Sequence, residues 1–350
     1  MMNKVFWKNR KVLVTGHTGF KGGWLTLVLL RLGANVTGLS LKESQKSFFS
    51  LCKIKNKINK NIYCNINNYI KLKKVILKND PEIVFHLAAQ PLVIESFINP
   101  ISTLNTNIIG TANLLNALRY GKKIKSIVIV TSDKCYENSN KKEYSENDKL
   151  GGADIYSASK SSSELITSAF RQSFFSNSKR VNIASARAGN VIGGGDFANN
   201  RIFPDIIKSY ENKKQCIIRN PKHTRPWQHV LDPISGYIRL AEKLYNSKNN
   251  KFNNGWNFGP PYENKSVQDI VNLIRQEINL KIKINNKTNK FNESKSLNLN
   301  SKKSKKYLNW ERKLNFKQSV KMTLNWYLNS KTKKDNFEFT LKQINEYFKK

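Results

Sequence analysis

The chain has 350 residues, enough for two domains or one large α/β unit, and its formal net charge is +37. Hydrophobic residues make up 39% and aromatic residues 11%, which excludes an intrinsically disordered chain. Only 12 of the 61 basic residues are Arg, the side chain best suited to reading bases and phosphates. The charge is therefore a general excess of Lys and argues against a nucleic-acid-binding protein.

Short apolar runs alternate with longer amphipathic segments in the first half of the chain. The predicted strands are Lys11–Thr15, Asn35–Leu41, Glu82–His86, Ser126–Thr131 and Val181–Ser185. The predicted helices are Phe20–Leu32, Asn105–Arg119 and Tyr156–Phe175. This alternation predicts an α/β fold, a Rossmann-type doubly wound parallel sheet with helices on both faces.

The second half is expected to hold a smaller, interleaved C-terminal substrate-binding domain. Segments 141–152 and 189–204 are rich in Gly, Asn and charge, which predicts loops, and weakly periodic helices follow residue 280. We expect a dinucleotide-binding domain at 1–188 with a returning segment at about 230–258. The second domain would comprise 189–229 and 259–350.

Cysteines and apolar segments bear on the cell compartment. No C-x-x-C pair occurs among Cys52, Cys64, Cys135 and Cys216, so neither a zinc ribbon nor a redox motif is supported. The apolar stretch Trp24–Leu32 is too short to span a bilayer and lacks the layout of a signal peptide. We expect a cytoplasmic protein with reduced thiols that uses no metal and no membrane.

A glycine-rich turn follows the first predicted strand and opens the first helix. Gly16, Gly19 and Gly22 allow a tight turn and a close approach of the backbone to a pyrophosphate at the helix N-terminus, next to Phe20 and Lys21. The spacing G-x-x-G-x-x-G differs from the G-x-G-x-x-G of ordinary Rossmann dehydrogenases. It resembles the extended branch of the short-chain dehydrogenase/reductase superfamily.

The catalytic pattern of that superfamily is Tyr-x-x-x-Lys, in which one helical turn places the ammonium group beside the phenol and lowers its pKa. Alone the pattern is weak, because chance predicts about two matches in so Lys-rich a chain and four occur. The tyrosines concerned are Tyr69, Tyr156, Tyr210 and Tyr327. Only Tyr156 with Lys160 begins a helix shortly after a strand that ends in the hydroxyl-rich turn Thr131–Lys134, so position selects this pair.

Two further segments resemble coenzyme contacts of the extended superfamily. His86 is followed by Leu87, Ala88, Ala89 and Gln90 at the end of a strand, where small residues let a cofactor lie close to the sheet. The segment beginning at Thr106 resembles the T-N-x-x-G-T helix of the same proteins.

Arginines gather in the second half, although they are scarce elsewhere. The segment Arg187–Asp196 contains Asn190, and it is followed by Arg201, Arg219 and Arg225-Pro-Trp-Gln-His229. Guanidinium groups bind a diphosphate through paired hydrogen bonds, so this region predicts the nucleotide-sugar end of the site.

The segments VTGHTGFKGGW, TSDKCYEN, YSASK, RAGNVIGGGDF and RNPKHTRPWQHVLDP together closely resemble the CDP-glucose 4,6-dehydratase family, from about residue 5 to 265. The resemblance implies an NAD-dependent hydro-lyase that makes CDP-4-keto-6-deoxyglucose for deoxysugar and surface polysaccharide biosynthesis. It also implies coenzyme contacts at Asn65 and Ile66, substrate contacts at Asn190, Arg201, Arg219, Arg225 and His229, and a homo-oligomer, dimer or tetramer. Asn65 stands where the family often has Asp.

The resemblance assigns chemistry to the strand-end residues. Tyr156, with Ser132 and Lys160, would take the proton of the sugar 4-hydroxyl while hydride leaves C4 for NAD. Asp133 would protonate the departing 6-hydroxyl if burial raises its pKa. Lys134 stands where relatives carry a Glu base and would remove the C5 proton, provided that it is partly neutral.

Residues alone leave several questions open. The second strand ends Ser40-Leu41-Lys42-Glu43, so the acid that signals NAD over NADP lies late and beside a lysine. Another nucleotide-sugar, or a 4-epimerase that shares Tyr156 and Lys160, remains an alternative reading. A basic nucleic-acid-binding protein is the remaining hypothesis, and the wide scatter of Lys speaks against it.

Overall fold

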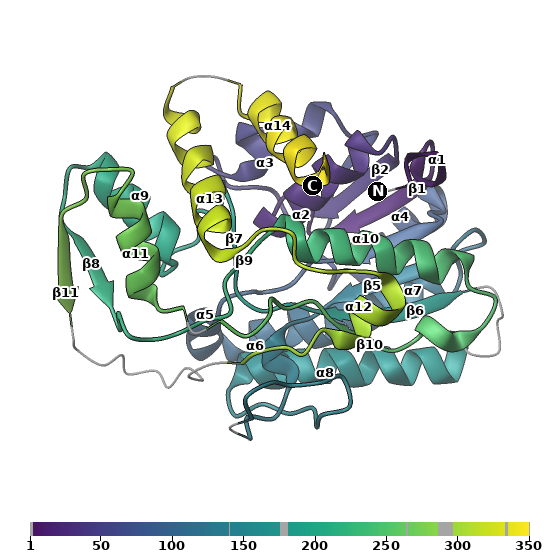
Figure 1. Cartoon of the computed structure of the whole chain (residues 1–350). Helices are drawn as coiled ribbons and strands as arrows, with labels where there is room; N and C mark the ends of the chain where they lie inside the picture. The colour runs from purple at the N-terminus through teal and green to yellow at the C-terminus, as the bar shows by residue number, and fades with distance from the viewer. Residues whose placement is uncertain are drawn as a thin grey trace.

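The computed structural model describes residues 3–139, 141–175, 181–263, 265–285, 297–332 and 335–349. Its centre is a seven-stranded sheet in the order β10-β6-β5-β4-β1-β2-β3, and all neighbouring strands run parallel (Figure 1). The strands are β1 (Lys11–Thr15), β2 (Asn35–Ser40), β3 (Lys60–Tyr63), β4 (Ile83–His86), β5 (Ser126–Val130), β6 (Asn182–Arg187) and β10 (Gly255–Asn257). The predicted Rossmann-type fold is confirmed, and the strand order reverses between β1 and β4, where such sheets bind ligands.

Helices cover both faces of the sheet because successive side chains of each buried strand point to opposite faces. Val12 and Val14 of β1 belong to the core shared with α2 (Phe20–Arg31) and α10 (Leu231–Asn246), whereas Leu13 belongs to the core of the other face. The helices of that face are α4 (Tyr69–Asn79), α7 (Gly110–Leu118) and α8 (Ile155–Phe170).

The three predicted helices are present within about one residue of their expected bounds, and two of them contain a π-helical turn. The expected helix Asn105–Arg119 begins as a π-turn, η2 (Asn105–Ile109), before α7, and α8 ends in a second π-turn, η4 (Arg171–Phe175). The remaining short elements are α1 (Lys4–Trp7), α3 (Phe48–Leu51), η1 (Ile54–Asn56), α5 (Val93–Ile98), α6 (Pro100–Leu104), η3 (Asp133–Cys135) and η5 (Asn250–Phe252).

A smaller group of elements lies to one side of the large sheet (Figure 1). It contains the parallel pair β8 (Cys216–Arg219) and β11 (Ile282–Asn285), with helices α9 (Ile202–Glu211) and α11 (Val267–Arg275). Between the two regions, β7 (Val191–Ile192) pairs with β9 (Gln228–His229). The chain then returns through α10 to β10, which pairs with β6; the domain boundaries given above remain a prediction.

Three helices end the chain: α12 (Lys302–Leu308), α13 (Phe316–Lys331) and α14 (Asn336–Lys349). α14 packs against α2 of the sheet region, and α13 packs against both α14 and α11. In the described ranges, no helix is both long and apolar enough to cross a membrane. Nor do three or more His, Cys, Asp or Glu side chains come together there as a metal site.

Candidate active site

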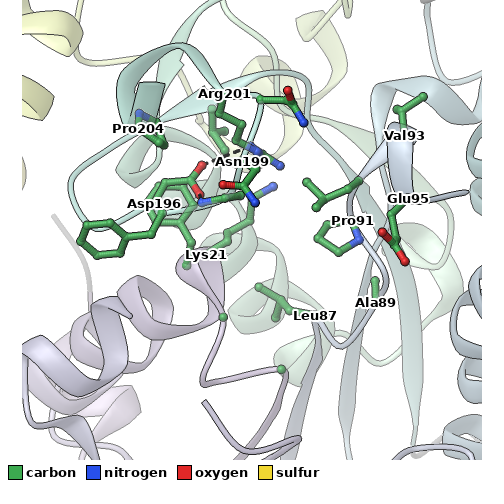
Figure 2. A pocket seen from close by; sticks show the side chains of 18 of the residues that line it. Lys21, Leu87, Ala89, Pro91, Val93, Glu95, Asp196, Asn199, Arg201 and Pro204 are labelled. Carbon is green, nitrogen blue, oxygen red and sulfur yellow. Dashed lines mark hydrogen bonds and ion pairs between the residues drawn. The ribbon is translucent and has the colours of Figure 1, made fainter. Parts of the chain in front are cut away.

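A cleft of about 1210 Å³ runs across the carboxyl ends of the sheet strands and continues toward β8. Most predicted site residues line it: Gly16, Gly19, Phe20, Lys21, Gly22, Asn65, Ile66, Leu87, Ala88, Ala89, Thr106, Ser132, Asp133, Lys134, Tyr156, Lys160, Asn190, Arg201 and Arg225. Figure 2 shows Lys21, Asp196, Asn199 and Arg201 grouped on one side of this space, with Pro91, Val93 and Glu95 across from them.

Two predicted residues, Gln90 and His229, are not among those lining the cleft. The side chain of Gln90 turns away to donate to the Thr103 hydroxyl at 2.8 Å and to the Leu92 carbonyl at 3.0 Å. His229 is fully buried beneath the cleft, edge-on to Trp24, and burial lowers its pKa to about 3. The Arg219 side chain lies outside the described part of the structure.

Two glycines of the turn after β1 leave no room for a side chain. Gly16 has φ of +73°, and a Cβ there would lie 2.6 Å from the backbone nitrogen of Ala88. A Cβ on Gly22 would lie 2.1 Å from the carbonyl oxygen of Gly16. The turn is therefore packed backbone to backbone at the N-terminus of α2, an arrangement that suits a dinucleotide pyrophosphate.

A buried histidine, His86, joins the ends of two sheet strands to α7 by hydrogen bonds. His86 Nδ1 is 2.7 Å from the Thr15 hydroxyl, and its Nε2 is 3.1 Å from the Thr111 hydroxyl. Burial, with a smaller effect from the Lys160 charge, lowers the pKa of His86 to about 3, so the ring is neutral near pH 7. Thr15 also accepts a hydrogen bond from Ala88 N at 3.3 Å, which joins the ends of β1 and β4.

Asn107 connects the β4 loop to the catalytic helix, a role that the sequence patterns do not reveal. Its side-chain oxygen accepts from Gln90 N at 2.8 Å, and its amide donates to the Ser159 hydroxyl at 2.9 Å. Ser159 in turn donates to the Tyr156 carbonyl at 2.7 Å. The loop after β4 is thus tied to the start of α8.

Tyr156 and Lys160 lie one turn apart at the start of α8, whose N-cap Asp154 accepts from Ser157 N. The Lys160 ammonium is 5.8 Å from the Tyr156 ring centroid, and the phenol is hydrogen-bonded with Ser132. Burial lowers the pKa of Lys160 to about 8. Burial also raises the pKa of Tyr156 to about 12, although the Ser132 hydrogen bond acts against this. Two buried titratable side chains thus lie on the same turn of α8 and line the cleft.

Asp133 and Lys134 follow Ser132 in the short turn η3. The Ser132 hydroxyl donates to Asp133 Oδ1 at 2.8 Å and accepts from Lys134 N at 3.2 Å. Burial raises the pKa of Asp133 despite the nearby Lys134 and Lys21 charges. Burial and the Arg201 and Lys160 charges lower the pKa of Lys21 to about 8. A buried carboxyl with a raised pKa therefore lies beside cationic groups in one cleft.

A buried ion pair joins α8 to the end of β6, one helical turn beyond Lys160. Arg187 Nε and Nη2 donate to Glu164 at 2.9 and 2.8 Å, and the hydroxyls of Thr131 and Ser185 donate to the same carboxylate. Burial acts to raise the pKa of Glu164, but Arg187 outweighs it and holds that pKa low. The i, i+4 spacing from Lys160 is the signal by which Glu164 could have been found in the sequence.

The coenzyme end of the cleft contains an acid in addition to the predicted residues. Glu43 lines the cleft and accepts a hydrogen bond from the Tyr63 hydroxyl of β3 at 2.7 Å. Nearby, Thr18 donates to the Leu41 carbonyl at 3.1 Å and is hydrogen-bonded to Ser40, both at the end of β2. Glu43 therefore lies in the cleft, although it stands three residues beyond the end of β2.

The parallel sheet, the glycine turn and the Tyr156–Lys160 pair define a dinucleotide-binding enzyme of the short-chain dehydrogenase/reductase type. A family model described as GDP-mannose 4,6 dehydratase matches residues 13–323. The CDP-glucose 4,6-dehydratase of Salmonella typhimurium is 49% identical over 281 residues, which cover 77% of each chain. The chain therefore belongs to the GDP-mannose 4,6 dehydratase family of nucleotide-sugar-modifying enzymes.

More distant relatives cover nearly the whole chain. Human dTDP-D-glucose 4,6-dehydratase is 26% identical over 328 residues, covering 91% of this chain and 90% of its own. An epimerase from Methanothermobacter thermautotrophicus has a TM-score of 0.79 at 23% identity over 97% of this chain and 96% of its own. A dTDP-glucose 4,6-dehydratase from Bacillus anthracis, solved with NAD, has a TM-score of 0.75 at 20% identity, covering 93% and 98%. These two solved structures confirm the fold.

Proposed function

We propose that this protein is an NAD-dependent CDP-glucose 4,6-dehydratase, which converts CDP-glucose to CDP-4-keto-6-deoxyglucose and water. The observation that carries the proposal is the grouping of Tyr156, Lys160 and Ser132 with Asp133 and Lys134 at one end of a dinucleotide cleft. An oxidoreductase that only moved hydride would have no use for the last two groups. The 49% identity to the Salmonella enzyme supports CDP-glucose as substrate.

NAD fits the coenzyme half of the cleft. Gly16 and Gly22 form a cradle that a Cβ would fill, and Ala88 packs directly on it. Glu43 can accept hydrogen bonds from ribose hydroxyls, and its negative charge disfavours the 2′-phosphate of NADP. When bound, NAD supplies an acceptor for hydride from sugar C4 and returns that hydride to C6.

The chain's own residues supply the proton transfers. Tyr156, assisted by Ser132 and Lys160, takes the proton of the 4-hydroxyl as the ketone forms, and this ketone acidifies the C5 hydrogen. Lys134 removes the C5 proton, and Asp133 gives its proton to the departing 6-hydroxyl, which leaves as water. A proton then returns to C5 as hydride reaches C6, so atoms and electrons balance.

Cations in the cleft suit the nucleotide diphosphate. Arg201 and Arg225 line the cleft together with Asn190, and we assign them to the pyrophosphate and the nucleoside. His229 is not given a substrate contact, because it is fully buried and its Nδ1 accepts from Leu231 N at 3.3 Å.

A homo-oligomer is supported by exposed apolar side chains on helices that pack together. Ile101, Ile109 and Leu165, from α6, η2 and α8, are between 49% and 67% exposed. Buried in a symmetric contact, such side chains would stabilise a dimer. Light scattering on Ile101→Glu is expected to give the monomer mass, and an unchanged mass would contradict this assignment.

Substrate identity is tested with purified protein and NAD. CDP-glucose, dTDP-glucose and GDP-mannose are incubated separately, and the 4-keto-6-deoxy product is followed by its absorbance in alkali and by mass. We expect turnover of CDP-glucose at least about a hundredfold faster than of the others. An epimer without loss of water would instead identify a 4-epimerase, and no turnover by folded protein would refute the dehydratase.

The role of Lys134 is tested separately. Lys134→Ala should form the 4-ketone, seen as transient absorbance of the reduced coenzyme, and should lose elimination by about a thousandfold. The matched control is Lys122→Ala, an exposed lysine between α7 and β5 that should behave as the wild type. Normal dehydration by Lys134→Ala would show that another group removes the C5 proton.

A further inference from the structure

The segment Gly193–Arg201, here called the 193–201 loop, is held on one side by the coenzyme-binding region. The Trp24 indole of α2 donates to the Gly194 carbonyl at 2.9 Å. A Cβ on Gly193 would lie 3.0 Å from the Phe20 ring, so the loop backbone packs directly on the first turn of α2. The loop therefore begins in a fixed position next to the glycine turn.

Helix α13, which lies beyond the segments that carry the sequence resemblance, holds the other side of the loop. Trp326 lies so close to Gly194 that a Cβ there would be 2.0 Å from the indole Cγ. The next residue, Tyr327, donates its hydroxyl to the Asp196 carbonyl at 2.5 Å. Both side chains are buried. The loop backbone is thus enclosed between α2 and α13.

The Tyr327 ring is itself fixed by aromatic contacts on either side of the loop. It meets Phe197 edge-on at 6.0 Å and stacks on Phe203 of α9 at 6.4 Å. Because these contacts already fix the ring, the Tyr327 hydroxyl loses little conformational entropy when it forms its hydrogen bond. Tyr327 therefore joins α13, the 193–201 loop and α9 at a single point.

The Asp196 side chain connects the loop backbone to Arg201, which lines the cleft. Its Oδ1 accepts from Ala198 N at 3.1 Å, and its Oδ2 pairs with Arg201 Nη1 at 3.3 Å. Figure 2 shows Asn199 and Arg201 facing the same part of the pocket as Lys21. Asp196 thus contacts Arg201 through its carboxylate and Tyr327 through its backbone carbonyl.

We propose that Tyr327 is a positioning residue for substrate: its hydrogen bond to the Asp196 carbonyl holds the 193–201 loop so that Arg201 faces the diphosphate. The choice of diphosphate ligand rests on the proposed function, whereas the loop contact does not. The C-terminal helices are thus part of the substrate site through α13, although none of the α13 side chains that the structure describes lines the cleft.

The test compares Tyr327→Phe with Tyr347→Phe. Tyr347 is a matched control because it is also a buried C-terminal tyrosine whose hydroxyl donates, here to Asp232 Oδ1 at 2.9 Å, away from the loop. Tyr327→Phe should raise KM for CDP-glucose and Kd for CDP about tenfold, with kcat within about twofold and Kd for NAD unchanged. Tyr347→Phe should lower Tm without changing KM.

Amide hydrogen exchange gives a readout independent of turnover. Tyr327→Phe should speed exchange in residues 193–201 relative to wild type, and Tyr347→Phe should not. Unchanged KM and exchange in Tyr327→Phe, or an equal change in both variants, would overturn the positioning role. If the wild type does not turn over CDP-glucose, the proposed function fails, and CDP affinity and loop exchange still decide the role of Tyr327.

Discussion

Lys160 is a titratable side chain that is almost fully buried, with only 5% of its surface exposed. Burial disfavours the ammonium form and lowers its pKa to about 8. The proposed function gives a reason for a lysine there, because a cation near Tyr156 would favour the phenolate in the proposed proton transfer. Such a site is expected to reduce the stability of the folded protein.

Replacement of Lys160 by Met should therefore stabilise the protein while abolishing activity. Below about pH 8 the Lys160 ammonium is charged in both the folded and the unfolded protein. The fall in its pKa from 10.5 to about 8 on folding then destabilises the folded protein by roughly 3 kcal/mol. As pH rises through 8, native Lys160 loses its proton first, so wild-type stability increases and the advantage of Lys160→Met shrinks.

Urea unfolding at about pH 7 and about pH 9.5 measures this effect. The stability advantage of Lys160→Met should fall by roughly 2 kcal/mol between the two conditions. Lys122→Met, at an exposed lysine, should show no such dependence. An equal advantage at both pH values would mean that burial does not perturb Lys160.

At this scale, sequence spacing located most of the candidate site but not the direction of every side chain. Among four Tyr-x-x-x-Lys matches, position selected Tyr156, and the structure places it in the cleft. Another of the four, Tyr327, turns out to anchor a loop. Gln90 and His229 stand near the site in sequence, yet their side chains face Thr103 and Trp24, because rotamers are set by neighbours distant in the chain.

At the scale of elements, a buried carboxylate joins α10 to the end of the chain. Asp232 Oδ1 accepts from Lys313 N and from the Tyr347 hydroxyl, both at 2.9 Å, while its Oδ2 has no partner among the described residues. Burial raises the pKa of Asp232 to about 6. The native state therefore retains a proton that the unfolded chain releases near 3.8.

The contact of α14 with α10 should weaken as pH rises through about 6, because Asp232 then becomes charged in the native state. Asp232→Asn does not titrate, so its stability relative to wild type should improve by about 1 kcal/mol between about pH 5 and about pH 8. Chemical unfolding at both pH values measures it. A constant difference between variant and wild type would contradict a raised pKa.

Buried parallel strands were the most predictable elements, since β1, β4 and β5 each contain a run of three or four apolar residues and lie within a residue of their predicted bounds. The pairs β7–β9 and β8–β11 had no such signal. Their strands are two to four residues long and pair across gaps of tens of residues, so only tertiary contact defines them.

At the scale of the whole molecule, the +37 charge creates a field that attracts anions. Lys21, Arg201 and Arg225 concentrate this field in the cleft. A nucleotide diphosphate should therefore be drawn in faster at low ionic strength, when the Debye length is long.

Accordingly, kcat/KM for CDP-glucose should fall several-fold between about 50 mM and about 500 mM salt, with kcat changing little. Steady-state kinetics in sodium chloride and in choline chloride distinguishes screening from a specific cation effect. A kcat/KM that does not depend on salt would show that the excess Lys plays no part in substrate capture.

The sequence by itself determined five strands of the sheet, the glycine turn and the position of the Tyr156–Lys160 pair. Each depends on local periodicity or on spacing within one helical turn or one strand end. Only the tertiary structure decided that α13 holds the 193–201 loop, that Glu43 reaches the coenzyme end and that His229 is buried. Those facts depend on packing between segments far apart in the chain, for which no local pattern exists.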